Sequence, residues 1–164
     1  MAEAKPVLFL NGPNLNMLGT RQPEIYGHAT LQDVEKAARA KAAELGLTID
    51  FRQSNSESEL VGWVQQARGS FAGIIINPAA FTHTSIALMD ALLIFDGPIV
   101  ELHVGNNFRR EEFRHRSFVS LATKAIVEGF GPDGYEIAVV GMSKLLKSLI
   151  RRKGSERRRV LRRS

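Results

Sequence analysis

A polar loop over residues 11–26 carries two side chains that together could take a proton from a substrate. It follows the apolar run 7–10 directly and contains Arg21 and Tyr26, five positions apart. A phenol titrates near 10 in water, about three units too high for a base at neutral pH. A guanidinium beside it favours the phenolate and lowers its pKa. Taken alone, the segment also fits a surface loop with an ordinary exposed tyrosine, but the motifs that follow favour a proton-abstracting loop.

A second pair, Glu101 and His103, lies at the end of a predicted strand over 98–104. Side chains alternate along a strand, so this spacing puts both on the same face. The carboxylate can then orient the imidazole, an arrangement typical of a general acid or base. A carboxylate in a buried strand needs a partner, which favours this interpretation over a histidine that merely ends a strand.

The segment 77–85, Asn-Pro-Ala-Ala-Phe-Thr-His-Thr-Ser, forms a third polar cluster at the end of a predicted strand. It leads into a predicted helix over 84–93, whose first backbone N–H groups suit hydroxyl or anionic groups of a ligand. His83 and the threonines beside it extend that donor set. The threonines also fit a simpler role as caps of the helix, and the two roles are compatible.

Three other chemistries fit the sequence less well. A hydrolytic triad of His83, Ser85 and Asp90 lacks the Gly-x-Ser-x-Gly turn that exposes a serine nucleophile. A metal site at His83, His103 and Glu101 lacks the close ligand spacing of zinc motifs, so we predict no metal. No P-loop and no Gly-x-Gly-x-x-Gly motif is present, so a nucleotide cofactor is not supported.

Strand and helix patterns alternate along the chain and indicate how these clusters are positioned. Short apolar strands are predicted at 7–11, 47–53, 73–77, 98–104 and 124–129, and helices at 31–45, 56–69, 84–93 and 134–149. This order predicts a single-domain α/β protein with a flavodoxin-like, open, parallel five-stranded sheet and helices on both faces. Ligands of such sheets lie beyond the carboxyl ends of the strands, where all three clusters fall.

Charge is distributed unevenly along the chain. The net charge is +5, but the segment from Lys144 onward holds ten basic residues and one acidic residue, which leaves a body of −4. We therefore predict a domain over 1–149 followed by a basic, disordered tail over 150–164. Such a tail could bind nucleic acid or an anionic membrane surface. It lacks interleaved aromatic residues, so we expect neither partner.

Cysteine usage and hydropathy exclude several further classes. The chain has no cysteine, hence no disulfide, thiolate metal site or cysteine nucleophile. No apolar run approaches the ~20 residues that span a bilayer, and residues 1–6 lack the apolar stretch of a signal peptide. A cytoplasmic location fits this composition best.

Taken together, the motifs resemble those of the type II 3-dehydroquinate dehydratases (3-dehydroquinases) from about residue 7 to residue 148. The resemblance is carried by several spaced motifs, namely Asn11-Gly-Pro-Asn-Leu-Asn16, Arg21 with Pro-Glu-Ile-Tyr-Gly27, Arg52-Gln-Ser-Asn55, Thr82-His-Thr-Ser85, Glu101-Leu-His103 and Arg110-Glu-Glu-Phe-Arg114-His. It implies removal of water from 3-dehydroquinate to give 3-dehydroshikimate through an enolate, without a cofactor. This reaction serves both aromatic amino-acid synthesis and quinate breakdown, and the sequence does not distinguish the two.

The resemblance also implies a role for each site residue. Tyr26 would remove the C2 proton with Arg21 beside it, Asn14 would hold a water on the enolate, and His103, oriented by Glu101, would protonate the departing hydroxyl. The groups implied to bind substrate are Asn77, His83 and Arg114 for its hydroxyls, the backbone N–H groups of Val104 and Gly105 for its carboxylate, and Asp90 of a neighbouring subunit, since the family forms trimers within dodecamers.

The sequence departs from the family pattern next to this site. Gly105 stands where the family usually has serine, Phe108 where it usually has histidine, and Arg116 interrupts a frequent His-His-Ser run. A lost hydrogen bond to a charged group costs about 1.5–3 kcal/mol, so we expect weaker substrate binding. Gly105 and Phe108 are the only support for an alternative, a divergent non-catalytic paralogue that binds a shikimate-like ligand.

Overall fold

The computed structural model describes residues 4–20 and 22–161, without the side chains of Ile25, Tyr26 and residues 156–161. Five parallel strands form one sheet in the order β2-β1-β3-β4-β5. The strands are β1 (Val7–Asn11), β2 (Ile49–Gln53), β3 (Gly73–Asn77), β4 (Ile99–His103) and β5 (Ala125–Glu128). The predicted open parallel sheet is confirmed, and β1 and β3 match the predicted bounds.

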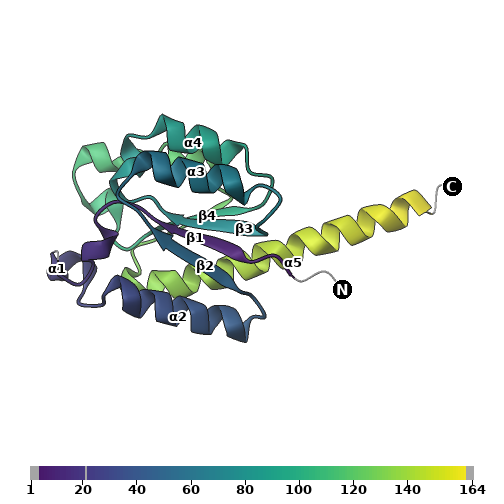
Figure 1. The fold of residues 1–164 in the computed structure, drawn as a ribbon, viewed down its shortest axis with the longest axis horizontal. Coiled ribbons are helices and arrows are strands. Elements are labelled where there is room, and N and C mark those ends of the chain that lie inside the picture. Colours follow the sequence, from purple (N-terminus) through teal and green to yellow (C-terminus); the bar gives the residue numbers. More distant parts are fainter. Residues whose placement is uncertain (1–3, 21, 162–164) are drawn as a thin grey trace.

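Helices cover both faces of the sheet, as Figure 1 shows. One layer holds α2 (Leu31–Glu44) and α5 (Gly134–Leu161), and the other holds α3 (Glu57–Ala67) and α4 (Ile86–Leu93). The inner strands supply alternate side chains to each layer: in β1, Phe9 packs with the first pair of helices, and Leu8 and Leu10 pack with the second. Continuously apolar strands are therefore buried on both faces, as a doubly covered sheet requires.

Local sequence accounts for the ends of α2. The Thr30 hydroxyl accepts a hydrogen bond from the backbone N–H of Asp33, whose carboxylate accepts one from the Thr30 N–H in return. This capping box satisfies two backbone donors at the helix start. At the other end, Gly46 has a φ of +71°, a conformation that glycine adopts without a Cβ penalty.

Two predicted helix boundaries are wrong. The predicted helix over 84–93 begins instead at Ile86, with Ser85 as its N-cap, because Thr82 is buried and bonded elsewhere and residues 79–83 form a 3-10 helix, η2 (Ala79–His83). Such short 3-10 turns also build the long segment between β4 and β5, which contains η3 (Asn107–Arg109), η4 (Glu112–His115) and η5 (Val119–Ala122).

The second wrong boundary is at the C-terminus. The helix expected to end at Leu149 continues to Leu161, so the predicted disordered tail is helical over 150–161. Arginine, lysine and leucine are good helix formers and the extension has no proline, so only Gly154 opposes the helix, at a cost of about 1 kcal/mol. In Figure 1 this part of α5 projects past the sheet, at the end opposite to α1 (Pro23–Tyr26).

Candidate active site

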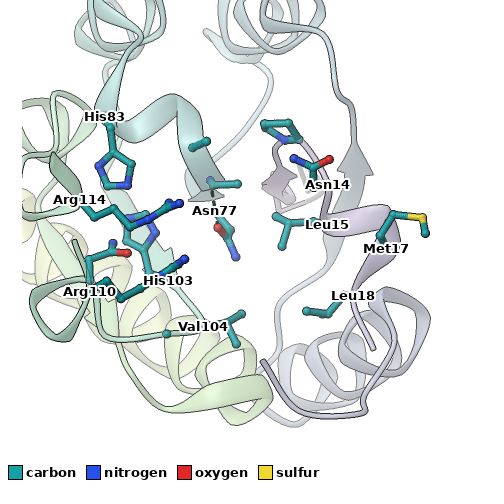
Figure 2. Close-up of a pocket in the computed structure, with 15 residues that line it drawn as sticks. Asn14, Leu15, Met17, Leu18, Asn77, His83, His103, Val104, Arg110 and Arg114 are labelled. Carbon is teal, nitrogen blue, oxygen red and sulfur yellow. Dashed lines mark hydrogen bonds between the residues drawn. The ribbon is translucent and has the colours of Figure 1, made fainter. Parts of the chain in front are cut away.

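A pocket opens at the carboxyl edge of the sheet, between the loop after β1 and the segments that follow β3 and β4. Figure 2 shows that its two sides differ in character. The loop after β1, which includes the 3-10 helix η1 (Leu15–Met17), contributes mainly apolar side chains together with Asn14. The opposite side is polar and carries Asn77, His83, His103, Arg110 and Arg114.

The two sides meet where the ends of β1 and β3 come close together. The backbone N–H of Gly12 donates to the carbonyl oxygen of Asn77 over 2.8 Å. A Cβ at Gly12 would lie 2.5 Å from the carbonyl oxygen of Pro78, so only glycine fits there. Beside it, Ala79 has a φ of +49° and its N–H donates to the Asn77 side-chain oxygen over 3.2 Å. A non-glycine residue in this region costs on the order of 1–3 kcal/mol, and such strain is typical of functional sites.

A buried hydrogen-bond chain beneath the pocket fixes the Asn77 side chain. The Tyr135 hydroxyl, at the start of α5, donates to the side-chain oxygen of Asn11 over 2.8 Å and accepts from the Asn77 amide over 3.3 Å. The Asn11 amide in turn donates to the carbonyl oxygen of Arg52 over 3.1 Å. Burial raises the pKa of the Tyr135 phenol, with Asn77 opposing it more weakly, so the hydroxyl keeps its proton and remains a donor.

Glu101 and His103 lie side by side on one face of β4, as their spacing predicts. His103 Nε2 is 2.7 Å from Glu101 Oε1, and both side chains are buried. A carboxylate oxygen accepts, so Nε2 carries the proton and donates it to this bond. The other ring nitrogen, Nδ1, is then the one left for exchange with a ligand in the pocket that His103 lines.

Three hydroxyl groups complete the surroundings of the Glu101 carboxylate, whose residue is 0% exposed. Thr82 Oγ1 donates to Oε1 over 2.6 Å and Ser117 Oγ donates to it over 2.8 Å, while Ser120 Oγ donates to Oε2. Burial alone would raise the pKa of Glu101, but the hydrogen bonds from His103, Ser120 and Thr82 outweigh it and hold the pKa below its ordinary value. The carboxylate is therefore ionised at neutral pH although it is buried.

His83 has the opposite electrostatic setting. Burial lowers its pKa first, and the nearby charge of Arg114 adds to the effect, so the ring is neutral at pH 7. Its Nδ1 donates to the carbonyl oxygen of Arg116 over 2.7 Å. In the neutral ring Nε2 then has a free lone pair, which suits the acceptance of a hydrogen bond from a substrate hydroxyl.

Two guanidinium groups supply positive charge to the pocket. Arg114 Nε donates to Glu111 Oε2 over 2.9 Å, and Arg110 Nε lies 3.6 Å from the same oxygen. Both side chains are largely buried and reach into the pocket in Figure 2. Glu111 orients this pair from outside, since it does not line the pocket.

Not every residue predicted for the site is placed there. Arg21 and the Tyr26 side chain lie outside the described residues, although the Tyr26 backbone belongs to α1. Asp90 is exposed on α4 and does not line the pocket of its own chain. The remaining predicted site residues line the pocket or, in the case of Glu101, support a residue that does: Asn14, Asn77, His83, Val104, Gly105, His103 and Arg114.

Sequence reasoning missed the supporting residues. Tyr135 lies 58 positions from Asn77 and gives no local signal, and Ser117 and Ser120 look like loop serines. One clue was present in the sequence: a buried glutamate requires hydrogen-bond donors, but the sequence does not show which residues supply them. Within residues 4–20 and 22–161 no three His, Asp or Glu side chains are grouped so as to hold a metal ion. Nor is any helix in this range long and apolar enough to cross a bilayer.

Comparison with known proteins agrees with this geometry. The Dehydroquinase class II family profile matches residues 5–143. The 3-dehydroquinate dehydratase of Cereibacter sphaeroides is 54% identical over 133 residues, 81% of this chain and 90% of the relative. That of Streptomyces avermitilis is 54% identical over 144 residues, 87% of this chain and 91% of the relative. The crystal structure of the type II dehydroquinase from Propionibacterium acnes superposes with a TM-score of 0.83 at 41% identity and covers 88% of this chain and 99% of that one. The chain belongs to the class II dehydroquinase family.

Proposed function

We propose that this chain is an active hydro-lyase that removes water from 3-dehydroquinate to give 3-dehydroshikimate, with Tyr26 as the base and His103 as the acid. The observation that carries the proposal is the Glu101–His103 pair, which joins a buried, ionised carboxylate to an imidazole that lines the pocket. A pocket with a positioned acid, two arginines and a neutral histidine suits the elimination of a hydroxyl group from a polar carboxylate.

The acid step follows from the hydrogen bond between His103 and Glu101. Glu101 keeps the Nε2 proton in place, so the protonated ring would give its Nδ1 proton to the C1 hydroxyl as that group leaves as water. The positive charge of the imidazolium is balanced by the adjacent carboxylate throughout, as in other carboxylate–histidine pairs. Glu101 would not itself take part in proton transfer.

The base step rests on the family resemblance of the loop after β1. Tyr26 as phenolate would take the C2 proton, Arg21 would favour its ionised form, and a water held by Asn14 would stabilise the enolate oxygen. In support, Asn14 lines the pocket, and its backbone N–H donates to the Asn55 side chain over 2.9 Å, which steadies the loop. Asn14 has a φ of +68°, a conformation that asparagine tolerates better than most residues.

Substrate recognition would divide between two regions of the polar side. Asn77, His83 and Arg114 would bind ring hydroxyls, with His83 Nε2 as an acceptor and Arg114 as a donor. The backbone N–H groups of Val104 and Gly105, just past the end of β4, would bind the carboxylate. No cofactor takes part in this scheme, because loss of water changes no oxidation state overall.

We further propose that the chain assembles into trimers, which pack as a dodecamer, and that Asp90 completes the pocket of a neighbouring subunit. In support, Asp90 shares its face of α4 with Ile86, Leu93 and Ile94, which are each more than half exposed in the single chain. Such a group of exposed apolar side chains is typical of an interface. Analytical ultracentrifugation of Leu93→Glu should give smaller species than the unchanged protein, and an unaltered assembly would contradict this interface.

The alternative, a paralogue that binds a ligand without turnover, is not favoured. Its support is limited to Gly105 and Phe108, whereas relatives at 54% identity are 3-dehydroquinate dehydratases. An absorbance assay decides the matter, since the product carries a conjugated enone that the substrate lacks. We expect turnover that persists with a metal chelator and falls at least about 100-fold in both Tyr26→Phe and His103→Gln. Ligand binding without turnover by the unchanged protein would instead support the paralogue.

A further inference from the structure

The hydroxyl cluster around Glu101, made of Thr82, Ser117 and Ser120, has no contact with the pocket and no place in the scheme above. We propose that these three hydroxyls are positioning residues that keep Glu101 ionised and its Oε1 aimed at His103. This inference rests on the proposed function and adds the groups that make the acid work.

The donors around Glu101 suit a charged carboxylate. Thr82 Oγ1, Ser117 Oγ and Glu101 Oε1 form a triangle whose three edges are 2.6–2.8 Å long. An ionised oxygen only accepts hydrogen bonds, so Oε1 can accept from both hydroxyls and from His103 Nε2, whereas a protonated Oε1 would itself have to donate. The backbone N–H of Ser120 donates to Ser117 Oγ over 3.0 Å, which leaves the Ser117 proton for Oε1.

The two carboxylate oxygens have different surroundings, which fixes the rotation of the group. Oε1 receives Thr82, Ser117 and the His103 ring, whereas Oε2 receives Ser120. Loss of the Ser120 bond would free the carboxylate to turn away from His103. Because hydrogen bonds to a charged group are about twice as strong as neutral ones, this loss would also favour protonation of Glu101.

The cluster also joins two separate segments to β4. Thr82 belongs to η2 after β3, whereas Ser117 lies just before η5 and Ser120 lies within it. The backbone N–H of Phe118 donates to the carbonyl oxygen of Thr82 over 2.8 Å, so the two segments are bonded to each other before they reach Glu101. A rigid frame of this kind holds a catalytic side chain within the small tolerance that proton transfer demands.

The charged and titratable groups around Glu101 are few. His103 on β4 contacts it directly, Glu128 on β5 lies opposite His103 in the sheet, and His83 on η2 interacts with it at longer range, as His83 does with Arg114 on η4. Neither β3 nor η5 carries a titratable side chain. A shift of the acid limb on removal of a hydroxyl therefore reports on Glu101 and its partner His103.

The test compares kcat and KM against pH for Ser120→Ala, whose hydroxyl bonds the Glu101 carboxylate. We expect kcat to fall about tenfold near pH 5 and less at pH 8, with KM within about twofold of the unchanged protein. The acid limb, which is the low-pH part of the profile where kcat declines, should have its midpoint about one pH unit higher. Thr82→Val should behave in the same way, and Thr82→Ser should restore the profile because it restores the hydroxyl. In a Glu101→Gln background, Ser120→Ala should cause no further loss of kcat.

Ser85→Ala is the matched control. Ser85 is a buried serine three positions from Thr82 whose hydroxyl caps α4 by accepting from the backbone N–H of Leu88 over 2.9 Å. It should lower stability without moving the pH profile. A uniform loss of kcat at every pH in Ser120→Ala, or a full loss in the Glu101→Gln background, would show that the cluster is merely structural.

A measurement independent of turnover separates this inference from the proposed function. The nitrogen-15 chemical shifts of the His103 ring should change with pH as Glu101 ionises. The midpoint of that change should lie about one pH unit higher in Ser120→Ala than in the unchanged protein. If the unchanged protein has no activity and the midpoint still moves, the function fails and the positioning role stands. If the midpoint does not move, the positioning role is overturned whatever the activity.

Discussion

Replacing Tyr135 by phenylalanine tests whether the buried chain beneath the pocket supports both the fold and substrate binding. The phenol ring packs between α5 and the sheet, stacked on Phe9 with ring centroids 5.3 Å apart, and phenylalanine preserves that packing. Only the hydroxyl is lost. Its loss leaves the Asn11 side-chain oxygen without a donor and the Asn77 amide without an acceptor.

The size of the effect follows from these two bonds. A buried polar atom left without its partner costs about 1–3 kcal/mol, and the 2.8 Å bond to Asn11 is worth more than the 3.3 Å bond from Asn77. The hydroxyl itself no longer has to be desolvated, so we estimate a net loss of about 2 kcal/mol. For a domain of this size that lowers Tm by about 4–8 °C. Release of the Asn77 amide should also raise KM about three- to tenfold, equivalent to about 0.6–1.4 kcal/mol.

Thermal unfolding and steady-state kinetics on the same preparation check both parts. Ser85→Ala serves again as the control, because it removes a buried hydroxyl that does not touch the pocket: Tm should fall and KM should stay unchanged. A Tyr135→Phe protein with Tm and KM both unaltered would refute the reasoning. A lower Tm with an unchanged KM would show that Tyr135 supports the fold but not Asn77.

Four further outcomes are expected. Gly105→Ser should lower KM by about one to two orders of magnitude if the missing hydroxyl weakens carboxylate binding, and an unchanged KM would contradict this. Gly12→Ala should unfold the carboxyl edge or abolish expression of soluble protein, because its Cβ would overlap a carbonyl oxygen at 2.5 Å, whereas Gly141→Ala, with no atom within 4 Å, should be tolerated. Since the folded state lowers the pKa of Glu101, the contribution of Glu101 to the free energy of unfolding is present above about pH 4.5 and should be lost as the pH falls below that value. Urea unfolding checks this, because the free energy of unfolding should differ less between pH 7 and pH 3.5 in Glu101→Gln than in the unchanged protein. Deletion of residues 151–164 should leave kcat/KM within about twofold, because this end of α5 projects away from the pocket, and a large loss would indicate a role in assembly.

Much of the fold could be predicted because local signals and burial agree. The continuously apolar strands over 7–11 and 73–77 have the predicted bounds, and the Thr30 and Gly46 ends of α2 follow from capping chemistry. The 3-10 turns between β4 and β5 could not be predicted, since they depend on long-range bonds such as that of Ser120 to Glu101 rather than on periodicity. The long end of α5 was missed for another reason: charge composition indicates exposure to solvent but does not exclude a helix.

For the site, the sequence could predict groups that act directly but not the groups that hold them. Glu101 and His103 are two residues apart on one strand, so strand geometry alone places them together. Asn11, Asn77 and Tyr135 are joined across 58 to 124 positions, and no short-range pattern reveals such a chain. Four arginines lie within positions 109–116, and the sequence does not show which of them face inward, because the turns that decide this are themselves set by tertiary contacts.

The two ends of α5 show how the fold separates the chemistry from the rest of the chain. At its start, Tyr135 is fully buried and bonded to both Asn11 and Asn77, so the helix contributes to the frame of the pocket. By Ile150 the helix has left the core and is exposed, and the sequence beyond it holds eight basic residues and one acidic residue, away from the carboxyl edge. The distance from this end of the helix to the carboxyl edge, together with screening by salt, weakens the effect of its charge on the pocket. Changes in the basic end should therefore alter the association of the protein with other molecules before they alter its catalysis.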